Sequence, residues 1–199
     1  MSPSRVRASL TQTFLRFAEG LPEDVRTRIY AGFPQAHRVQ IQKTLGLGWV
    51  PLEQHLLLLD VARQSLPGDP REAFRSFHRD AILEAFQQPF FKTIVDGFVR
   101  AFGLSPGTIM RAAPTGFSFA FRGCGEVTWV DSSRKDERES RLVLEGFPPE
   151  HFASGLFSEG MVATLDSFLS LCKVSGEASV TGVDLNRGHA EYVLRWRPA

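Results

Sequence analysis

The five histidines of this chain are the side chains best suited to acid–base or metal chemistry, but they are scattered along 199 residues. A metal site needs converging ligands, and spacings such as H-x-x-x-H or C-x-x-C bring two of them together on one element. Neither spacing occurs here, so the sequence predicts no metal site. An enzyme would have to assemble its site from separate elements. The candidates for such a dispersed site are His78, Glu84, His189 and Glu191.

Three side chains are candidate nucleophiles, and each has a structural interpretation that we favour. The stretch GFSFA at 116–120 is similar to the G-x-S-x-G elbow of hydrolases, but Ala120 replaces the last glycine and Ser118 falls within an alternating pattern. Cys124 lies between two glycines with no basic residue adjacent to lower its pKa. Cys172 ends an apolar helical stretch and is interpreted as a small buried residue. The sequence therefore predicts no catalytic residue.

Composition excludes several functional classes. The net charge of +1 gives no general attraction to nucleic acid, so no nucleic-acid partner is expected. No stretch approaches the roughly 20 apolar residues of a membrane span. Two cysteines are too few for a disulfide framework, and the first residues lack an apolar signal-peptide core. We therefore expect a cytoplasmic protein without a membrane span.

The first 112 residues show helical periodicity interrupted by proline and glycine. Asp69 stands directly before Pro70, so Asp69 is expected to cap a helix whose first residue is the proline. A last short helical turn is predicted in SPGTIMRAAP, which ends at Pro114. The predicted helices begin near residues 6, 22, 34, 52, 70 and 89.

The periodicity then changes to that of strands. In FSFAFR, three phenylalanines alternate with smaller or polar residues, which predicts a half-buried strand over 117–122. EVTWV and RLVLEGF are predicted as its partners, with a charged solvated loop at 132–139 between them. A long helix follows, and then a hairpin whose last strand alternates up to Trp196.

Sequential strands joined by short turns imply an antiparallel sheet, so the predicted fold class is α+β. An N-terminal helical layer is expected to pack on a C-terminal antiparallel sheet, with one long helix inserted between strands. We expect a single α+β domain over 1–199, in which 1–112 form the helical part and 113–199 the sheet part.

The 17 phenylalanines are the unusual feature of the composition, since the chain has only 2 tyrosines. An aromatic helical layer against an aromatic strand face either fills a core or encloses an apolar ligand pocket. The residues predicted to act as pocket or anchor side chains are Phe98, Phe117, Phe119, Tyr192 and Trp196.

The closing helix and hairpin, HFASGLFSEGMVATLDSFLSLC followed by EASVTGVDL and HAEYVLRW, resemble the superfamily of haem–nitric-oxide-binding domains, 4-vinyl-reductase domains and TRAPP subunits. The segments WVPLEQHLLLLDVARQSLPGDPREAFRSFHRD and FGLSPGTIMRAAP resemble an uncharacterised family of myxobacterial paralogues of similar length. The resemblance covers about residues 25–197. It implies a sensory or scaffold module.

The chain departs from this superfamily where cofactors are held. Haem-binding members carry a Y-x-S-x-R motif that grips the propionates, but Tyr30 is followed by Ala31, Gly32, Phe33 and Pro34. The 4-vinyl-reductase type carries cysteines near the final hairpin, whereas no cysteine follows Cys172 here. The resemblance therefore implies a module without the known cofactors.

Three functional hypotheses remain. The first is a non-enzymatic cytoplasmic regulatory or scaffold module that acts through a protein partner, in which a homodimer is also compatible with the sequence. The second is a domain that senses a small apolar ligand in a pocket between helices and sheet. The third is an enzyme with the dispersed histidine and carboxylate site.

The missing motifs generate the first testable prediction. The purified protein should carry neither haem nor stoichiometric zinc, because it lacks the propionate motif and the cysteine cluster. Absorption spectroscopy and elemental analysis measure both. A haem absorption band, or one zinc per chain, would show that other residues hold the cofactor.

Overall fold

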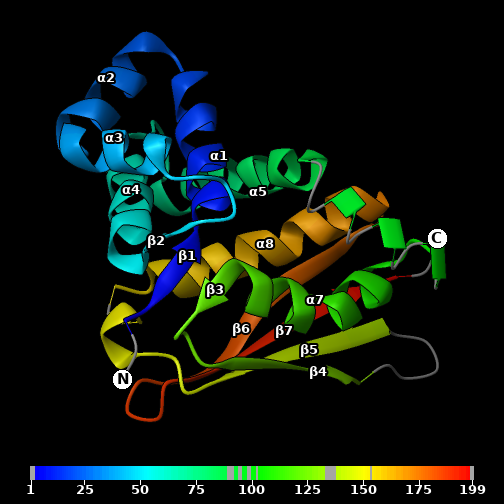
Figure 1. The fold of residues 1–199 in the computed structure, drawn as a ribbon. Coiled ribbons are helices and arrows are strands. Elements are labelled where there is room, and N and C mark those ends of the chain that lie inside the picture. Colours follow the sequence, from blue (N-terminus) through cyan, green and yellow to red (C-terminus); the bar gives the residue numbers. More distant parts are fainter. Residues whose placement is uncertain are drawn as a thin grey trace.

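The computed structural model describes residues 3–88, 92–93, 96–97, 100–101, 103–132, 138–152 and 154–197. Its fold class is α+β, as predicted. N-terminal helices pack against a C-terminal antiparallel sheet (Figure 1), and helix α8 (Leu156–Cys172) is inserted between strands β5 (Arg138–Glu145) and β6 (Gly176–Asp184).

Several helices of the helical layer begin and end at the prolines and glycines that the sequence analysis identified. Asp69 caps α5 as expected, since its Oδ1 accepts hydrogen bonds from the backbone N–H groups of Arg71 at 3.0 Å and Glu72 at 2.9 Å. Gly20 ends the first helix, and Pro22 precedes the second. The helices described in this layer include α1 (Ala8–Glu19), α2 (Glu23–Gly32), α3 (Gln35–Lys43), α4 (Leu52–Ser65) and α5 (Pro70–Gln87). The helix predicted to begin near residue 89 falls largely outside the described residues.

A small sheet, which the sequence did not predict, brings together a strand before α1, a strand before α4 and a strand at residues 121–122. It has the order β2-β1-β3, with β1 (Arg5–Arg7) pairing antiparallel to β2 (Trp49–Pro51) and to β3 (Phe121–Arg122). These strands are two or three residues long, which is too short to show an alternating pattern.

The main sheet has four antiparallel strands in the order β4-β5-β7-β6. Strand β7 (His189–Trp196) is central, and it pairs with β5 on one side and β6 on the other. Its alternating residues Ala190, Tyr192, Leu194 and Trp196 are all buried on the inner face. Helix α8 contacts β6 and β7 from this side. The remaining elements of this part are β4 (Glu126–Asp131) and the short 3₁₀ helix η1 (Pro149–His151).

Of the other residues of β7, Val193 is buried, while His189, Glu191 and Arg195 meet their neighbours through polar or charged contacts. Arg195 Nε donates to Glu139 Oε2 at 2.7 Å, and Arg141 Nη1 donates to Glu191 Oε1 at 2.7 Å. His189 Nδ1 lies 2.9 Å from Glu145 Oε1. Cross-strand pairs of this kind add modest stability and fix strand register.

The predicted strand over 117–122 is wrong. Helix α7 (Pro106–Ala120) continues past Pro114 to Ala120, and only Phe121 and Arg122 are extended. Phe117 and Phe121 are four residues apart, so a helical turn also places them together, and their rings stack with centroids 4.8 Å apart. Alternation of these residues therefore did not distinguish a helix from a strand.

Phe119 is the residue that separates the two interpretations. A strand would place it on the same face as Phe117, but it is only half-buried on the opposite side of α7. There the guanidinium of Arg7 lies 4.4 Å from its ring centroid and 3.9 Å from that of Trp49. Phe119 thus belongs to the contact between α7 and the small sheet.

Two sequence-based boundaries also change. Of the charged loop expected at 132–139, Arg138 and Glu139 already belong to β5, and residues 133–137 lie outside the described residues. Helix α7 also crosses residue 112, where the helical part was expected to end. Buried residues of both parts form one hydrophobic cluster, with Phe14 and Phe74 from the helical layer and Leu142 and Tyr192 from the sheet.

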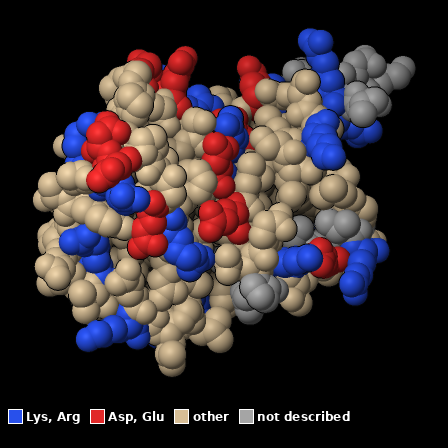
Figure 2. All heavy atoms as spheres, turned by 90° about the horizontal axis from the view of Figure 1, so that it is seen from above, with Lys and Arg blue, Asp and Glu red and all other residues tan. Residues whose placement is uncertain are grey.

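Acidic and basic side chains are interspersed over the face seen in Figure 2, as the small net charge leads one to expect. Among the described helices, none combines the length and the apolar character that crossing a bilayer requires.

Gly116 offers a test of the helical assignment of α7. A Cβ added there would meet no atom within 4 Å, so Gly116→Ala should add helix propensity without a clash. We expect the free energy of unfolding to rise by about 0.5–1 kcal/mol, measured by chemical denaturation.

Gly160 in α8 is the matched control, because it is also helical but crowded. Its added Cβ would come within 2.9 Å of His78 Cε1, so Gly160→Ala should lower stability. Equal effects of the two substitutions would contradict this packing.

Candidate functional site

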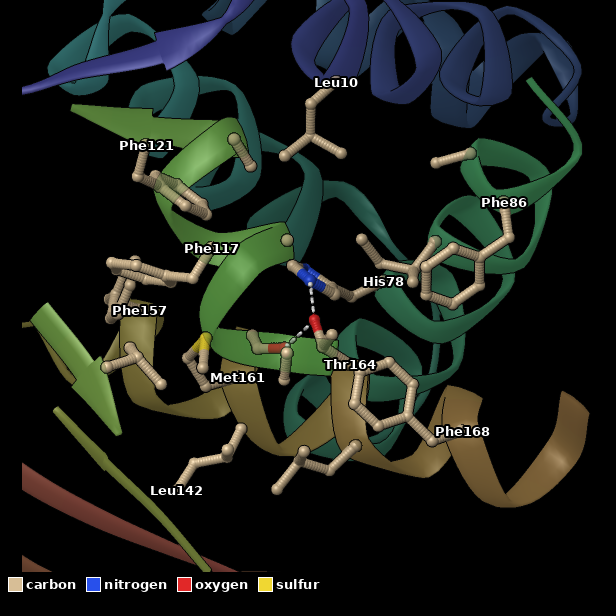
Figure 3. A pocket seen from close by; sticks show the side chains of 18 of the residues that line it. Leu10, His78, Phe86, Phe117, Phe121, Leu142, Phe157, Met161, Thr164 and Phe168 are labelled. Carbon is tan, nitrogen blue, oxygen red and sulfur yellow. Dashed lines mark hydrogen bonds between the residues drawn. The ribbon is translucent and has the colours of Figure 1, made fainter. Parts of the chain in front are cut away.

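A cavity of about 150 Å³ lies between the helical layer and the inner face of the sheet (Figure 3). Helices α1, α4, α5, α7 and α8 all contribute to its wall, and strands β4 and β5 contribute Val127 and Leu142. Most lining side chains are apolar, and several are phenylalanines. Those labelled in Figure 3 are Leu10, His78, Phe86, Phe117, Phe121, Leu142, Phe157, Met161, Thr164 and Phe168.

Helix α7 forms one wall of the cavity because its inward face carries small residues. Ala112, Ala113, Gly116 and Ala120 recur at helical spacing and line the cavity. Their short side chains leave space that larger residues would fill.

Two buried histidines are the titratable groups of the described wall. His55 on α4 has Nδ1 3.1 Å from Thr11 Oγ1, and His78 on α5 has Nε2 3.2 Å from Thr164 Oγ1. The ring of Phe14 packs between them, with centroids 5.3 Å from His55 and 4.8 Å from His78. Each imidazole therefore contacts one threonine hydroxyl and the Phe14 ring, and His78 also lies near Phe74, with ring centroids 5.6 Å apart.

Burial keeps both imidazoles neutral. Desolvation lowers the pKa of His55 to about 4. The pKa of His78 is lowered to about 3, mainly by desolvation and also by the charge that His55 would carry. At neutral pH the wall therefore presents polar nitrogen atoms without net charge.

The residues predicted to act as pocket or anchor side chains lie in different parts of the structure. Phe117 lines the cavity, whereas Phe119 lies outside it under Arg7. Tyr192 is fully buried, and its hydroxyl donates to Ser158 Oγ at 3.3 Å. Burial raises the pKa of Tyr192 to about 12. Phe98 falls outside the described residues.

Trp196 is buried but faces a different space. It lines a second hollow of about 670 Å³, at the start of α7 and the neighbouring end of the sheet. Trp129 and Arg111 also line this hollow, with the Arg111 guanidinium 5.1 Å from the Trp129 ring centroid. The final hairpin therefore closes the core with Tyr192 and borders this hollow with Trp196.

The candidate nucleophiles are not activated. Ser118 is exposed on α7 and donates to the carbonyl of Thr115 at 3.0 Å. Cys124 is buried in the turn before β4, and burial raises its pKa. Cys172 is only half-buried, in contrast to the buried residue expected, and its partial burial raises its pKa to about 11. Both thiols are less ionised than a free cysteine, so neither is a ready nucleophile.

The dispersed enzyme site is not assembled, which corrects that hypothesis. His78 lies in the cavity, but His189 and Glu191 lie on the outer face of the sheet, where they pair with Glu145 and Arg141. Glu84 is partly exposed on α5, 4.0 Å from Arg16. In the described part of the chain, no three metal-ligating side chains converge either.

Comparison with known proteins identifies the architecture. No protein-family model and no curated protein sequence matches the chain. Solved structures do match along nearly its whole length. An Fe(II) unliganded H-NOX protein mutant from K. algicida superposes with a TM-score of 0.61 at 6% identity, covering 96% of this chain and 97% of that one. The chain has the H-NOX fold.

Two further H-NOX structures support the same architecture. An oxygen-binding H-NOX domain related to soluble guanylate cyclases matches with a TM-score of 0.60 at 10% identity, over 96% of this chain and 94% of that one. A mutant of the T. Tengcongensis H-NOX matches with a TM-score of 0.61 at 9% identity, over 96% of each chain. At such low sequence identities, these superpositions establish the fold alone. The ligand that this chain could bind has to be inferred from its own residues.

Those residues do not fit the haem that the H-NOX fold implies. A cavity of about 150 Å³ is smaller than the roughly 300–1,000 Å³ of pockets that hold drug-sized ligands and cofactors. No described lining residue is an arginine or lysine that could pair with propionates. The chain's second tyrosine, Tyr192, is followed by Val193, Leu194, Arg195 and Trp196, so it does not begin a Y-x-S-x-R motif either.

Sequence reasoning assigned His78 to a dispersed enzyme site and did not identify His55 as a site residue, although a signal for both as cavity residues existed. His55 lies three residues after Leu52, and His78 lies four after Phe74, so both follow the inward helical face. A polar residue on an otherwise apolar helical face is the feature that could have identified them.

The neutral histidines generate a pH prediction. Their folded pKa values lie below the ordinary 6.5, so protons bind preferentially to the unfolded chain. The free energy of unfolding should fall as the pH drops below about 6.5, by up to about 1.4 kcal/mol per pH unit for each histidine.

Denaturant unfolding between pH 7 and pH 5 measures this slope. Replacing either residue, as His55→Leu or His78→Leu, should remove its share of the slope even where overall stability falls. A slope that both variants retain would show that the imidazoles ionise freely in the folded protein.

Proposed function

We propose that this chain is a non-enzymatic sensor module, which binds a small apolar molecule in the cavity between its helical layer and its sheet and acts on a protein partner. The cavity is the observation that carries this proposal. It has about 150 Å³ of interior space and an almost entirely apolar wall. An engineered cavity of about 150 Å³ in another protein binds benzene or xenon, so this volume suits one small ring.

The position of the cavity suits a sensor. The described part of its wall comes from five helices and from strands β3, β4 and β5, so a bound molecule would contact both layers of the fold at once. A ligand that favours one relative arrangement of these layers shifts the protein toward that arrangement. Binding at such a place can therefore alter surfaces far from the cavity.

The fold comparison supports the same class of function. The matched structures include an oxygen-binding domain related to soluble guanylate cyclases. We infer a sensor that uses the same fold with a different ligand, since the wall here suits an apolar molecule rather than haem. The separation of His78 from His189 and Glu191 disfavours an enzyme. The resemblance to the myxobacterial paralogues stays a prediction.

Ligand titration tests the proposal. Toluene or benzene should raise the free energy of unfolding with concentration, approaching about 2.7 kcal/mol at a hundredfold excess over Kd. Chemical shift changes of Met161 and the lining phenylalanines should saturate over the same concentration range.

Gly116→Leu is the blocking variant, because its side chain would enter space in which a Cβ meets no atom within 4 Å. We expect this variant to fold and to lose ring binding. Gly97→Ala is the control, since its Cβ also meets no atom within 4 Å but Gly97 does not line the cavity. Saturable binding that persists unchanged in Gly116→Leu would place the ligand elsewhere.

A further inference from the structure

His78 presents an unpaired nitrogen atom in the wall of the cavity. Its Nδ1 is buried and has no hydrogen-bond partner among the described residues, and the whole side chain is more than nine-tenths buried. A buried polar atom left unpaired costs about 1–3 kcal/mol, so such atoms are rare in folded proteins. An unpaired atom in a cavity wall points to a ligand that pairs with it.

The neighbouring hydrogen bonds fix the chemical character of this nitrogen. The Thr164 hydroxyl donates its one hydrogen to the carbonyl of Gly160 at 2.9 Å. The same oxygen lies 3.2 Å from His78 Nε2, so it must accept there, and Nε2 carries the hydrogen. This tautomer follows from the hydrogen-bond network. In a neutral imidazole with hydrogen on Nε2, Nδ1 is an acceptor.

The packing of His78 holds this acceptor in place. Its ring lies over Gly160, where an added Cβ would come within 2.9 Å of Cε1 and 3.3 Å of Nδ1. Phe14 packs on the ring from α1, and Phe74 lies 5.6 Å away between centroids. Figure 3 shows the imidazole reaching from α5 to Thr164 on α8 among apolar side chains. The orientation of the imidazole ring is therefore fixed by contacts with Gly160, Phe14, Phe74 and Thr164.

We propose that the molecule bound in this cavity is a small ring compound with one hydrogen-bond donor, such as a phenol, and that the donor pairs with Nδ1 of His78. This inference rests on the proposed function and specifies its ligand. The apolar wall recognises the ring, and the buried acceptor selects the hydroxyl or N–H group. A site that leaves a buried polar atom unpaired discriminates against analogues that lack the matching group.

The experiment compares phenol with toluene, which have similar shape and differ in the donor. Kd values are measured by NMR titration for the wild-type protein and for variants, and the quantity of interest is the ratio of phenol to toluene affinity. His78→Leu removes the acceptor. Thr164→Val removes the oxygen that fixes the tautomer and keeps the shape of the side chain. We expect each to lower the ratio by about tenfold.

His37→Leu is the matched control. His37 on α3 also has a buried Nδ1 without a described partner, but it does not line the cavity, so the affinity ratio should stay at the wild-type value. Thr164→Val also guards against a folding artefact, because it leaves His78 itself in place.

The outcomes separate the two proposals. If the wild type binds toluene but the ratio is the same in all variants, the donor inference is overturned and the apolar sensor stands. If benzonitrile, an acceptor-only ring, gains affinity over toluene through His78, the tautomer is the opposite one and the donor inference is likewise overturned. If the wild type binds none of these rings, the proposed function fails and the inference with it.

Discussion

The close approach of α5 to α8 at Gly160 is the contact on which the interior arrangement depends. Without a side chain at this position, the His78 imidazole can lie directly over the α8 backbone, where even a Cβ would come within 2.9 Å of it. Thr164, one turn later on α8, then pairs with the same ring. This contact sets the spacing of the two helices, and α7 lies across the sheet beside α8. The cavity is the space that side chains leave open between these three helices, α1, α4 and the sheet.

The final hairpin supports this arrangement from the other side. Tyr192 enters the core and bonds to Ser158 on α8, which fixes the helix against the central strand. On the outer face, Glu139 pairs with Arg141 on its own strand and with Arg195 on β7. Arg141 in turn pairs with Glu191, so two ion pairs join β5 to β7. Desolvation opposes the ionised form of Glu139, but the two arginines outweigh it, so the pKa of this carboxyl is lowered. The final hairpin is therefore attached to α8 on the inner face and to β5 on the outer face.

Much of the architecture was predictable because strong local signals agreed with the tertiary structure. Asp69 before Pro70 is an unambiguous helix start, and the alternation up to Trp196 is long enough to define a strand face. The error at 117–122 has a physical cause. Phe117 and Phe121 satisfy both a period of two and a spacing of four, and Pro114 was interpreted as the end of a helix that in fact continues.

The candidate site was less predictable than the fold, since a cavity depends on what several elements leave unfilled. The phenylalanine-rich composition suggested an apolar site, and Phe117 does line it. However, Ala113, Gly116 and the neutral His78 can be recognised as cavity-lining residues only when α7 is placed opposite α5. Sequence periodicity indicates which face is buried, but it does not indicate how densely that face is packed.

Unfilled interior volume also has a thermodynamic consequence. At about 24 cal/mol per Å³, a cavity of about 150 Å³ corresponds to about 3–4 kcal/mol of packing stabilisation that the chain does without. That is a considerable share of the roughly 5–15 kcal/mol that separates most folded domains from their unfolded chains. Selection for stability alone would favour larger residues at positions such as Gly116. Because the chain has small residues at these positions, a molecule that fits the cavity stabilises the folded state in proportion to the logarithm of its concentration. The fraction of folded protein, and with it resistance to proteolysis, then depends on that concentration.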